Sequence, residues 1–467
     1  ARDRARVVMV GAVGMELARA PFFKKEVSFS VSRSYGPGRY DLAYEEGGAD
    51  YPIGYVRWTE GRNMEAVLDL MRAGDLRLGP LISHRFDIDA AEKAYDLIAG
   101  GATDSLGILL TYPSSEESVL TRRVDLVEHP KRVPGEPGVG FIGAGSFATS
   151  TLLPAMKRYG NVRMTGVCTA SGISAQHAAK KFGFDFAATA IEELLLDDST
   201  DAIAIATRHD RHAAEICAVL RSDRHVFCEK PLCLNVDELK KIVSEWRAHR
   251  GQRSVMVGFN RRFAPLARQL RAHVAGGAGA YSIQYRVNAG AIPLSHWTRD
   301  TEIGGGRLIG EVCHFIDFAS FITEAEPTRV TAVRPSTSDE DMLLTLEMTD
   351  GSAASIAYVT QGGASLPKEL IEVHRSGLSG VLENFQVLEL HGRSGRPKTR
   401  KGGQDKGHAS QMAGWVESLK SGEPQISFRS LVATTLATFA AEESITRGNT
   451  VELDVDSVLA LADPLEG

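Results

Sequence analysis

The sequence predicts an α/β protein with a doubly wound domain over residues 139–258 and an α+β domain with a largely antiparallel open sheet over residues 259–467. Three observations lead to this prediction. A short apolar run ends in a glycine-rich turn at Gly143, and a helical pattern follows. Strand and helix signals then alternate up to Gly258. Beyond that point, strands follow one another across short turns such as Asp350-Gly351.

Composition limits the classes to which the chain can belong. It has 467 residues, 43% hydrophobic and 24% charged, which is ordinary for a soluble protein of two or three domains. A net charge of -6 gives no reason to expect nucleic acid or an anionic membrane as a partner. No apolar run approaches the roughly 18 residues of a membrane span, and no signal peptide is visible. The five cysteines form no zinc spacing or disulfide framework, so we expect a cytoplasmic protein with reduced thiols and no metal.

A shorter α/β segment, residues 1–113, precedes these domains. Apolar or alternating patterns predict strands at 6–11, 27–31, 82–86 and 106–111. Helices are expected at 63–73, ended by Gly74, and at 89–98, with Asp89 as the capping residue. No helical run is expected after Gly11-Ala12-Val13-Gly14, because Pro21 and the residues after it intervene, so no phosphate loop is expected here. Serines, prolines and glycines over residues 114–138 then predict a linker.

In the doubly wound domain, periodicity predicts five strands, at 139–143, 164–169, 202–207, 225–229 and 254–258. Crossover helices are expected at 149–159, 174–182, 191–196, 211–220 and 235–247. In the last domain, helices are expected at 265–274, 306–321 and 430–447. Its strands are expected at 280–287, 328–333, 342–348, 353–358, 369–375, 380–383, 387–390 and 451–453.

The glycine-rich turn has the order of elements that dinucleotide binding requires. Gly143 permits a tight turn, Gly145 lets a pyrophosphate approach the backbone, and Ala148 lets the helix pack close to the strand. The helix N-terminus then presents free N–H groups to the phosphates. This context predicts a Rossmann domain that binds NAD or NADP. The second strand ends at Thr169 and Ser171 without an acidic residue or an arginine, so either cofactor is compatible.

Four clusters beyond residue 138 resemble, in this order, the Gfo/Idh/MocA oxidoreductases. They are the glycine turn, Thr207-Arg208-His209-Asp210-Arg211-His212, Glu229-Lys230-Pro231, and Gly304-Gly305 with the later His314-Phe315-Ile316-Asp317. The resemblance implies hydride transfer between a secondary alcohol and nicotinamide, with Lys230 holding the substrate hydroxyl and His314 as the base. Asp317, three residues after His314, shares its helix face. The implied cofactor contacts are Gly143, Gly145, Ser146, Phe147, Ala148, Thr169, Ser171, Thr207, His212, Glu229 and Lys230.

One departure from that family lies in the expected catalytic helix. Many members carry an aspartate four residues before the histidine, where this chain has Gly310, and Glu311 stands one residue later. Glu311 is three residues before His314 and can share its face, so we take it as the third catalytic candidate. Polar and aromatic residues in loops suit a sugar, including Lys406 and His408. The predicted substrate contacts are Asn260, Arg261, His296, Trp297 and Asp317.

The first segment resembles the C-terminal part of medium-chain zinc-type alcohol dehydrogenases. The resemblance rests on the helix at 63–74, on Pro80-Leu81-Ile82-Ser83-His84-Arg85-Phe86 and on Ala90-Ala91-Glu92-Lys93-Ala94-Tyr95. It implies a truncated partner domain without a zinc site or a glycine loop.

The combined interpretation is an NAD(P)-dependent oxidoreductase of sugars, nucleotide sugars or cyclitols. It acts on a small molecule, binds neither nucleic acid nor a membrane, and is expected to form a homo-oligomer through its C-terminal sheet. Two alternatives stay open at this point. Gly310 is compatible with a non-catalytic nucleotide-binding scaffold, and the abrupt start is compatible with a fragment of a longer bifunctional fusion.

Overall fold

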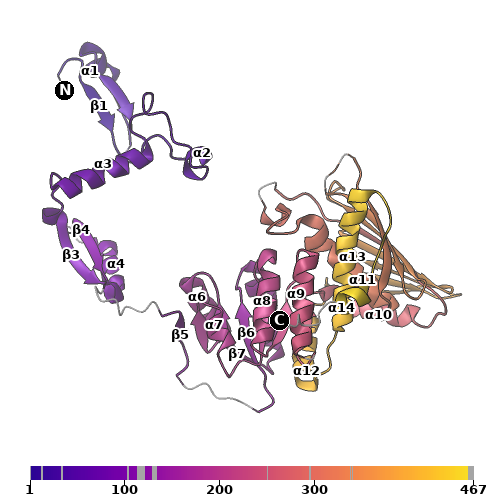
Figure 1. The fold of residues 1–467 in the computed structure, drawn as a ribbon. Coiled ribbons are helices and arrows are strands. Elements are labelled where there is room, and N and C mark those ends of the chain that lie inside the picture. The colour runs from indigo at the N-terminus through magenta and orange to yellow at the C-terminus, as the bar shows by residue number, and fades with distance from the viewer. Residues whose placement is uncertain are drawn as a thin grey trace. The chain divides into compact units, whose positions relative to one another are not determined.

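The chain divides into two compact units, Ala1–Leu120 and Thr121–Gly467. The computed structural model (Figure 1) describes residues 2–11, 14–32, 35–101, 105–112, 121–128, 134–249, 251–293, 296–336, 338 and 340–460. Much of the predicted linker, at residues 114–120 and 129–133, lies outside this set, as does residue 113. No helix in the described part of the chain is long and apolar enough to cross a membrane.

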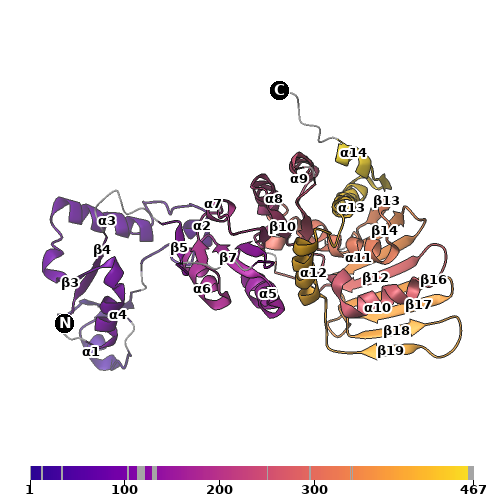
Figure 2. The ribbon, with the colours of Figure 1, turned by 90° about the horizontal axis from the view of Figure 1, so that it is seen from below.

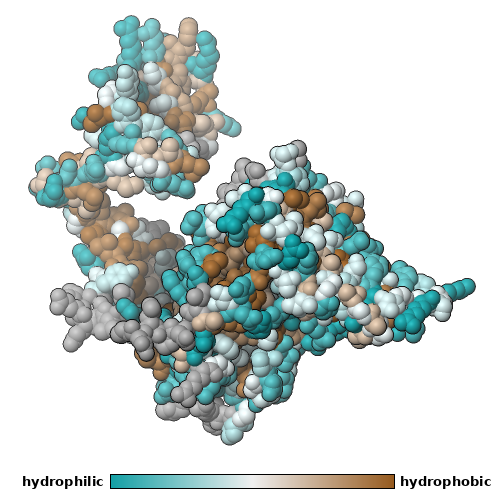
Figure 3. All heavy atoms as spheres, turned by 45° about the vertical axis from the view of Figure 1, so that its right-hand side comes forward, coloured by the Kyte–Doolittle hydropathy of each residue, from teal (hydrophilic) through white to brown (hydrophobic). Residues whose placement is uncertain are grey.

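The first unit contains two separate parallel sheets of two strands each and little buried surface. Ala94 is the one hydrophobic residue buried among its described residues, whereas Tyr55 is 92% exposed. Hydrophobic residues are visible on its surface (Figure 3). Parallel strands are normally covered on both faces, so this unit has little core of its own. Its elements are β1 (Arg6–Met9), α1 (Arg19–Lys24), β2 (Ser28–Val31), α2 (Leu42–Glu45), α3 (Glu60–Ala73), β3 (Ile82–Asp87), α4 (Ala91–Ala99) and β4 (Gly107–Thr111).

Two predictions about this unit are wrong. A short helix, α1, runs through Pro21, although we expected no helix there. Proline is tolerated because it stands in the first helical turn, where its missing N–H has no partner to lose. Asp89 does not cap α4, because it lies inside the 3₁₀ turn Ile88–Ala90 that leads into the helix. The predicted end of α3 at Gly74 is confirmed, and Gly74 has a left-handed φ of 80°.

The second unit begins with a seven-stranded sheet that is parallel except for its edge strand β5. The strand order β11-β10-β9-β6-β7-β8-β5 reverses between β6 and β9. In a sheet of this kind, ligands bind in the crevice beyond the carboxyl ends of the strands at such a reversal. The strands are β5 (Arg123–Asp125), β6 (Gly138–Ile142), β7 (Arg163–Cys168), β8 (Phe186–Ala188), β9 (Ala202–Ile205), β10 (His225–Cys228) and β11 (Val255–Val257).

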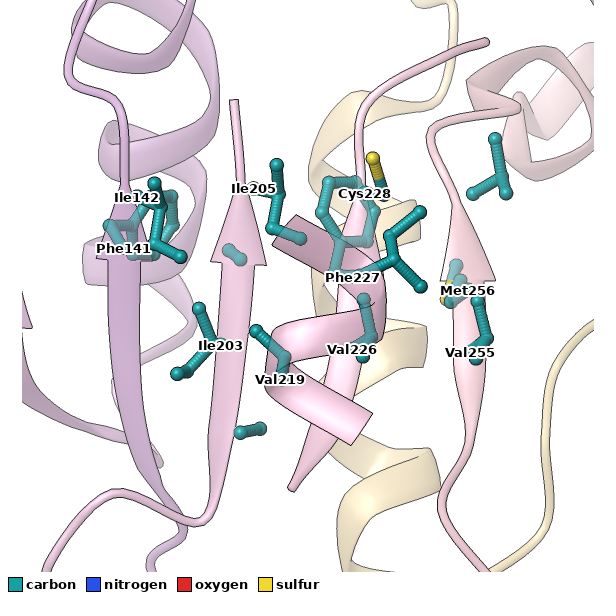
Figure 4. Packing of buried hydrophobic residues seen from close by; sticks show 14 of the residues in the cluster. Phe141, Ile142, Ile203, Ile205, Val219, Val226, Phe227, Cys228, Val255 and Met256 are labelled. Atoms are coloured by element: carbon teal, nitrogen blue, oxygen red, sulfur yellow. The ribbon is translucent and has the colours of Figure 1, made fainter. Parts of the chain in front are cut away.

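Helices pack on this sheet, and its strands are buried almost throughout except for the edge strand β5, which has no fully buried residue. Figure 4 shows Phe141, Ile203, Val226 and Phe227 in this core. Trp415 of a later helix, α12 (His408–Ser421), belongs to the same cluster, so α12 packs on the nucleotide domain. The other helices are α5 (Leu153–Tyr159), α6 (Gly172–Phe182), α7 (Glu192–Leu195), α8 (His212–Arg221) and α9 (Val236–Ala248).

A nine-stranded sheet forms the second half of the unit, and its strands lie side by side in Figure 2. Buried and exposed residues alternate along its strands. The buried ones form one face of the sheet, which packs on α10 (Pro265–Val274), α11 (Cys313–Thr323) and α13 (Phe428–Arg447). All neighbours are antiparallel except β12 and β15. The strands are β12 (Ser282–Asn288), β13 (Pro327–Val333), β14 (Met342–Met348), β15 (Ala353–Val359), β16 (Glu369–Arg375), β17 (Leu378–Glu383), β18 (Val387–His391), β19 (Lys398–Lys401) and β20 (Val451–Glu452).

Several elements were not predicted. The short strands β5, β8 and β19 lack a period-two apolar pattern long enough to recognise, and α12 contains an interior glycine, Gly414. The helix α14 (Val455–Ala460) closes the described chain. Two expected α-helices begin instead with a π-helical turn, η3 (Ala148–Leu152) after the glycine turn and η7 (Leu308–Val312) before α11. Such wide turns often occur at functional sites.

We predict that Gly138→Ala destabilises the second unit by about 3 kcal/mol. A Cβ on Gly138 would lie 1.9 Å from the backbone oxygen of Ser199, so β6 or its neighbour would have to shift. Chemical unfolding measures the effect. Gly402→Ala is the control, because a Cβ there meets no atom within 4 Å. Equal unfolding midpoints for the two variants would show that the contact is not as tight as described.

Candidate active site

A cavity of about 1010 Å³ lies at the carboxyl ends of β6, β9 and β10, where the strand order reverses. Loops and helix ends of the second half of the unit form its other wall. Thirteen of the predicted site residues line it together, namely Gly143, Gly145, Ser146, Phe147, Ala148, Thr207, Glu229, Lys230, Asn260, Arg261, His296, Trp297 and His314. The sequence therefore identified most of the wall of one cavity from segments far apart in the chain.

The glycine turn has the geometry that a pyrophosphate requires. Gly143 has a φ of +91°, and a Cβ on it would lie 2.6 Å from the backbone oxygen of Ala206. A Cβ on Gly145 would meet no atom within 4 Å, so the space beside this backbone is open. The helix formed by η3 and α5 starts next to this open space and presents its first N–H groups there. The residues present therefore fit a bound dinucleotide.

Lys230 crosses the cavity from the nucleotide domain to the second half of the unit. Its Nζ donates a hydrogen bond of 2.8 Å to the backbone oxygen of Gly310 in η7. No side chain at position 310 competes for this ammonium. The space that a side chain at position 310 would need is taken by two groups. A Cβ on Gly310 would lie 2.9 Å from the backbone oxygen of Gly304 and 3.3 Å from the imidazole of His209. Nδ1 of His209 donates to the oxygen of Gly304 at 2.7 Å.

His209 lines the cavity, although the sequence interpretation did not select it. Its ring meets Trp297 edge-on, with 4.8 Å between the ring centroids. Burial, together with the nearby charge of Lys230, lowers the pKa of His209 to about 3, so its imidazole is neutral. The sequence signal that could have identified His209 is that two histidines, His209 and His212, follow the third predicted strand. Arg208, Asp210 and Arg211 of this loop also line the cavity.

His314 is 6% exposed and stands at the start of α11. No hydrogen bond to its imidazole is found among the residues that the structure describes, and Nδ1 is buried. Burial first, and then the charges of Arg261 and Lys230, hold the pKa of His314 well below its usual range. An uncharged imidazole with a free ring nitrogen is the state that can accept a proton.

Glu229 is a second titratable group without a full set of partners. Its Oε1 is buried and has no hydrogen-bond partner in the described part of the chain. The carboxylate lies over Gly258, where a Cβ would be 2.7 Å from Oε2. Burial raises the pKa of Glu229 to about 7, and the neighbouring Lys230 opposes this shift. Glu229 therefore titrates near neutral pH at the wall of the cavity.

A buried carboxylate, Glu369 at the start of β16, organises the opposite wall. Arg261 donates to it through Nε at 2.7 Å, and Nζ of Lys406 donates to its other oxygen, also at 2.7 Å. Tyr285 donates a third hydrogen bond at 2.5 Å. Burial disfavours the charged form of Glu369, but Arg261 and Lys406 outweigh it, so the pKa of Glu369 lies below its usual range. Asn260 donates to the backbone oxygen of Lys406 at 2.8 Å.

Five predicted residues do not line the cavity, and for three of them, His212, Asp317 and Glu311, the contacts correct the expected role. His212 is fully buried, and its Nδ1 donates to the oxygen of Pro231 at 2.7 Å, so it supports the turn that carries Lys230. Asp317 is fully buried as well and accepts a hydrogen bond of 2.9 Å from Nε of Arg262. It therefore neither orients His314 nor reaches a substrate.

Glu311 is the third correction. Its carboxylate accepts hydrogen bonds from Tyr358 at 2.5 Å, Lys368 at 3.2 Å and Arg307 at 3.3 Å. Burial opposes its ionisation, but Lys368 and Tyr358 lower the pKa of Glu311 to about 2. It is thus a charged structural carboxylate with its oxygens already engaged, and we remove it from the catalytic set.

Thr169 and Ser171 lie at the end of β7, the neighbour of β6, outside the residues that line the cavity. Thr169 donates to the backbone oxygen of Ser171 at 2.6 Å. Ser171 is exposed and precedes α6. Their expected contact with the cofactor ribose stays a prediction. Among the described residues, no group of three or more His, Cys, Asp or Glu side chains is placed to hold a metal ion.

Comparisons with known proteins show an oxidoreductase family that the second unit resembles. Residues 138–259 match the model of GFO_IDH_MocA, an oxidoreductase family with an NAD-binding Rossmann fold. The 1,5-anhydro-D-fructose reductase of Ensifer adhaerens is 28% identical over 203 residues, or 42% of this chain and 60% of the reductase. An inositol 2-dehydrogenase of Rubrobacter xylanophilus is 26% identical over 307 residues, or 61% of this chain and 83% of that protein. The chain thus spans only part of the relatives that it matches.

A solved structure shows the same fold. Levoglucosan dehydrogenase in complex with NADH superposes with a TM-score of 0.59 at 21% identity, over 68% of this chain and 99% of that one. Together, these likenesses support the Gfo/Idh/MocA oxidoreductase family for the second unit and an NAD-binding Rossmann fold for residues 138–259. They do not extend to an alcohol dehydrogenase origin of the first unit, which stays a prediction.

We predict that Glu229→Gln changes how stability depends on pH. Glu229 has a pKa of about 7 when folded, against a usual 4.5. The contribution of the protonated Glu229 carboxyl to the free energy of unfolding is therefore fully present below pH 4.5 and is lost as the pH rises through 7. The variant cannot ionise, so its unfolding free energy relative to wild type should rise by on the order of 3 kcal/mol between pH 4.5 and 8.

Urea unfolding at several pH values measures this difference. Glu442→Gln, at an exposed position of α13, is the matched control and should follow the wild type at every pH. Parallel curves for Glu229→Gln and wild type would show that Glu229 ionises normally.

Proposed function

We propose, from the premise that residues 138–259 form the NAD-binding Rossmann domain of a Gfo/Idh/MocA oxidoreductase, that the second unit is an NAD(P)-dependent oxidoreductase. Its substrate is a sugar, nucleotide sugar or cyclitol whose CH–OH group is oxidised, or whose carbonyl is reduced. The observation that carries the proposal is that Lys230 and the unpartnered His314 line one cavity with the glycine turn. The names of the relatives, an anhydrofructose reductase and an inositol dehydrogenase, support this class of substrate.

Residues of the glycine turn hold the cofactor in this proposal. The open backbone at Gly145 and the first N–H groups of the following helix bind the pyrophosphate. Thr169 and Ser171 lie at the end of the adjacent strand and contact the adenosine ribose. The cofactor, when bound, supplies the hydride acceptor or donor at its nicotinamide ring.

The chain's own groups handle the proton and the orientation of the substrate. The ammonium of Lys230 donates to the substrate oxygen and stabilises the negative charge that develops there. The imidazole of His314 accepts the hydroxyl proton during oxidation and returns it during reduction. Trp297 and His296 offer an aromatic face and a polar edge for the ring of a sugar, and Asn260 fixes the loop that carries Lys406.

The state of assembly and the first unit are separate parts of the proposal. Every second side chain along β14 and β15 is exposed or partly exposed, and these side chains form the outer face of the nine-stranded sheet. We assign this outer face as the surface through which copies of the chain associate. The first unit is taken as an alcohol dehydrogenase-like segment that carries no active site of its own.

We predict that Gly145→Val abolishes cofactor binding without unfolding the protein. A Cβ here meets no atom within 4 Å, so we expect the fold to tolerate the valine, whose side chain occupies the approach of the pyrophosphate. Titration of NADH fluorescence should show a Kd at least 100-fold higher than that of wild type, at an unchanged melting temperature. Wild-type affinity in this variant would remove the glycine turn from the binding site.

We predict that Lys230→Met and His314→Gln each lower kcat at least 100-fold, because each removes a group that acts on the reacting hydroxyl. The measurement is absorbance at 340 nm with a panel of cyclitols and nucleotide sugars, using both NAD and NADP. Neither variant should change the NADH Kd more than threefold. Lys240→Met, an exposed lysine of α9, serves as the control and should retain full activity. NADH binding without turnover of any substrate by the wild type would favour the scaffold alternative.

A further inference from the structure

The substrate half of the cavity carries more positive than negative charge. Lys230, Arg261 and Lys406 line it and bring three basic side chains to its wall. Two carboxylates lie close to them, Glu229 with a pKa near 7 and the shared Glu369, whereas the nearby Glu311 is already engaged by Lys368 and Arg307. Even with both carboxylates ionised, one positive charge is left without a counterion among these groups.

The excess charge is concentrated where Arg261 and Lys406 meet. Glu369 is completely buried and accepts from Arg261, Lys406 and Tyr285, so its oxygens have no capacity left for a ligand. The single negative charge of Glu369 thus neutralises only one of the two positive charges, those of Arg261 and Lys406. The side chain of Lys406 is 19% exposed, whereas that of Arg261 is 7% exposed, so the remaining charge reaches the cavity mainly through Lys406.

The backbone adds a partial positive charge at the same place. The 14-residue helix α12 begins at His408, two residues after Lys406, and no side chain caps the N–H groups of its first turn. The exposed Asp405 accepts a hydrogen bond of 2.8 Å from the N–H of Gly407, the residue before the helix. Gly407 pins this start against the turn at residues 260–264, because a Cβ there would lie 2.5 Å from the backbone oxygen of Asn260. The helix N-terminus and Lys406 are therefore held together, and both favour an anion.

An independent observation points to a ligand in this half of the cavity. The imidazole of His314 is more than nine-tenths buried, lines the cavity and has no hydrogen-bond partner among the described residues. The same cations, Arg261 and Lys230, disfavour its protonated form. A negative charge on the substrate would offset these cations and favour the uptake of a proton by His314.

We propose that the substrate carries an anionic group, a carboxylate or a phosphate, which binds to Lys406 and Arg261 at the N-terminus of α12. This inference rests on the proposed function and narrows its substrates to acidic or phosphorylated sugars. In this proposal the cofactor pyrophosphate binds at the glycine turn. The start of α12 lies beside that turn, where the ring of His408 meets that of Phe147 with 5.7 Å between the centroids, so the NADH affinity of a Lys406 variant distinguishes a substrate anion from the pyrophosphate. Lys406 is here a specificity-determining residue that contacts the substrate away from the reacting hydroxyl.

The test compares D-glucose with D-glucuronate and D-glucose 6-phosphate, which add a carboxylate or a phosphate to the same ring. Each sugar is titrated into the NADH-loaded full chain, and binding is followed by calorimetry. NADH occupies the pyrophosphate site, so the titration reports on the rest of the cavity. At least one charged sugar should bind tenfold or more tightly than glucose, and the comparison between the two identifies the anionic group.

Variants of Lys406 assign the preference to this residue. Lys406→Met should lower the affinity for the charged sugar at least tenfold, and that for glucose less than threefold. Lys406→Arg keeps the charge and should retain the preference. Lys401→Met, at an exposed position on β19, is the control and should behave as wild type.

Three results would overturn the inference. Charged sugars could bind no more tightly than glucose, including the case in which none binds, or Lys406→Met could weaken all three sugars equally. Alternatively, Lys406→Met could raise the NADH Kd and leave sugar discrimination unchanged, which would assign the site to the cofactor. Failure of the proposed function has a different signature, because it appears as absent turnover at 340 nm, whereas this preference is a binding measurement.

Discussion

The reversal of strand order between β6 and β9 is the constraint on which the rest of the second unit depends. The chain leaves β6 toward β7 on one side and returns at β9 on the other, so the loops after these strands diverge and leave a crevice. A Cβ on Gly143 would lie 2.6 Å from the backbone oxygen of Ala206, so this turn requires a residue without a side chain. The polar residues that end β9 and β10 reach the same crevice because parallel strands share one carboxyl edge.

The second half of the unit completes the cavity because α12 packs on the nucleotide domain. Trp415 and Met412 of this helix belong to the hydrophobic core of the Rossmann sheet, not to that of the nine-stranded sheet. This packing brings the first residue of α12, His408, to the glycine turn, where its ring meets Phe147 at 5.7 Å. The two walls of the cavity are thus held together by apolar burial, and the site does not depend on surface ion pairs, which contribute little.

Electrostatics in the cavity follow from which carboxylates are already engaged. Glu311 binds Lys368 and Tyr358, and Glu369 binds Arg261 and Lys406, so neither offers an oxygen to a ligand. Gly310 provides only its backbone oxygen to Lys230. The outcome is a site with ammonium and guanidinium groups and neutral imidazoles, in which Glu229 is the carboxylate that titrates near pH 7. Burial first, and the nearby cations second, suppress the protonation of His209 and His314.

Local patterns in the sequence determined the elements of this protein and the edge of the sheet where chemistry occurs. The apolar run before Gly143 and the strand before Glu229 are encoded within a few residues, and so is the position of Lys230 at the carboxyl edge. His314 lies on a helix of the other half of the unit, and it was placed in the cavity only through the resemblance to the Gfo/Idh/MocA oxidoreductases. Only the tertiary structure decided the partners of the charged groups, because these partners come from distant strands and helices. Arg261 and Glu369 are 108 residues apart, and helix periodicity could not reveal that Asp317 faces Arg262 instead of His314. Which histidine of the loop after β9 faces the cavity also depended on packing, since His212 is buried under the turn and His209 fills the space that Gly310 leaves.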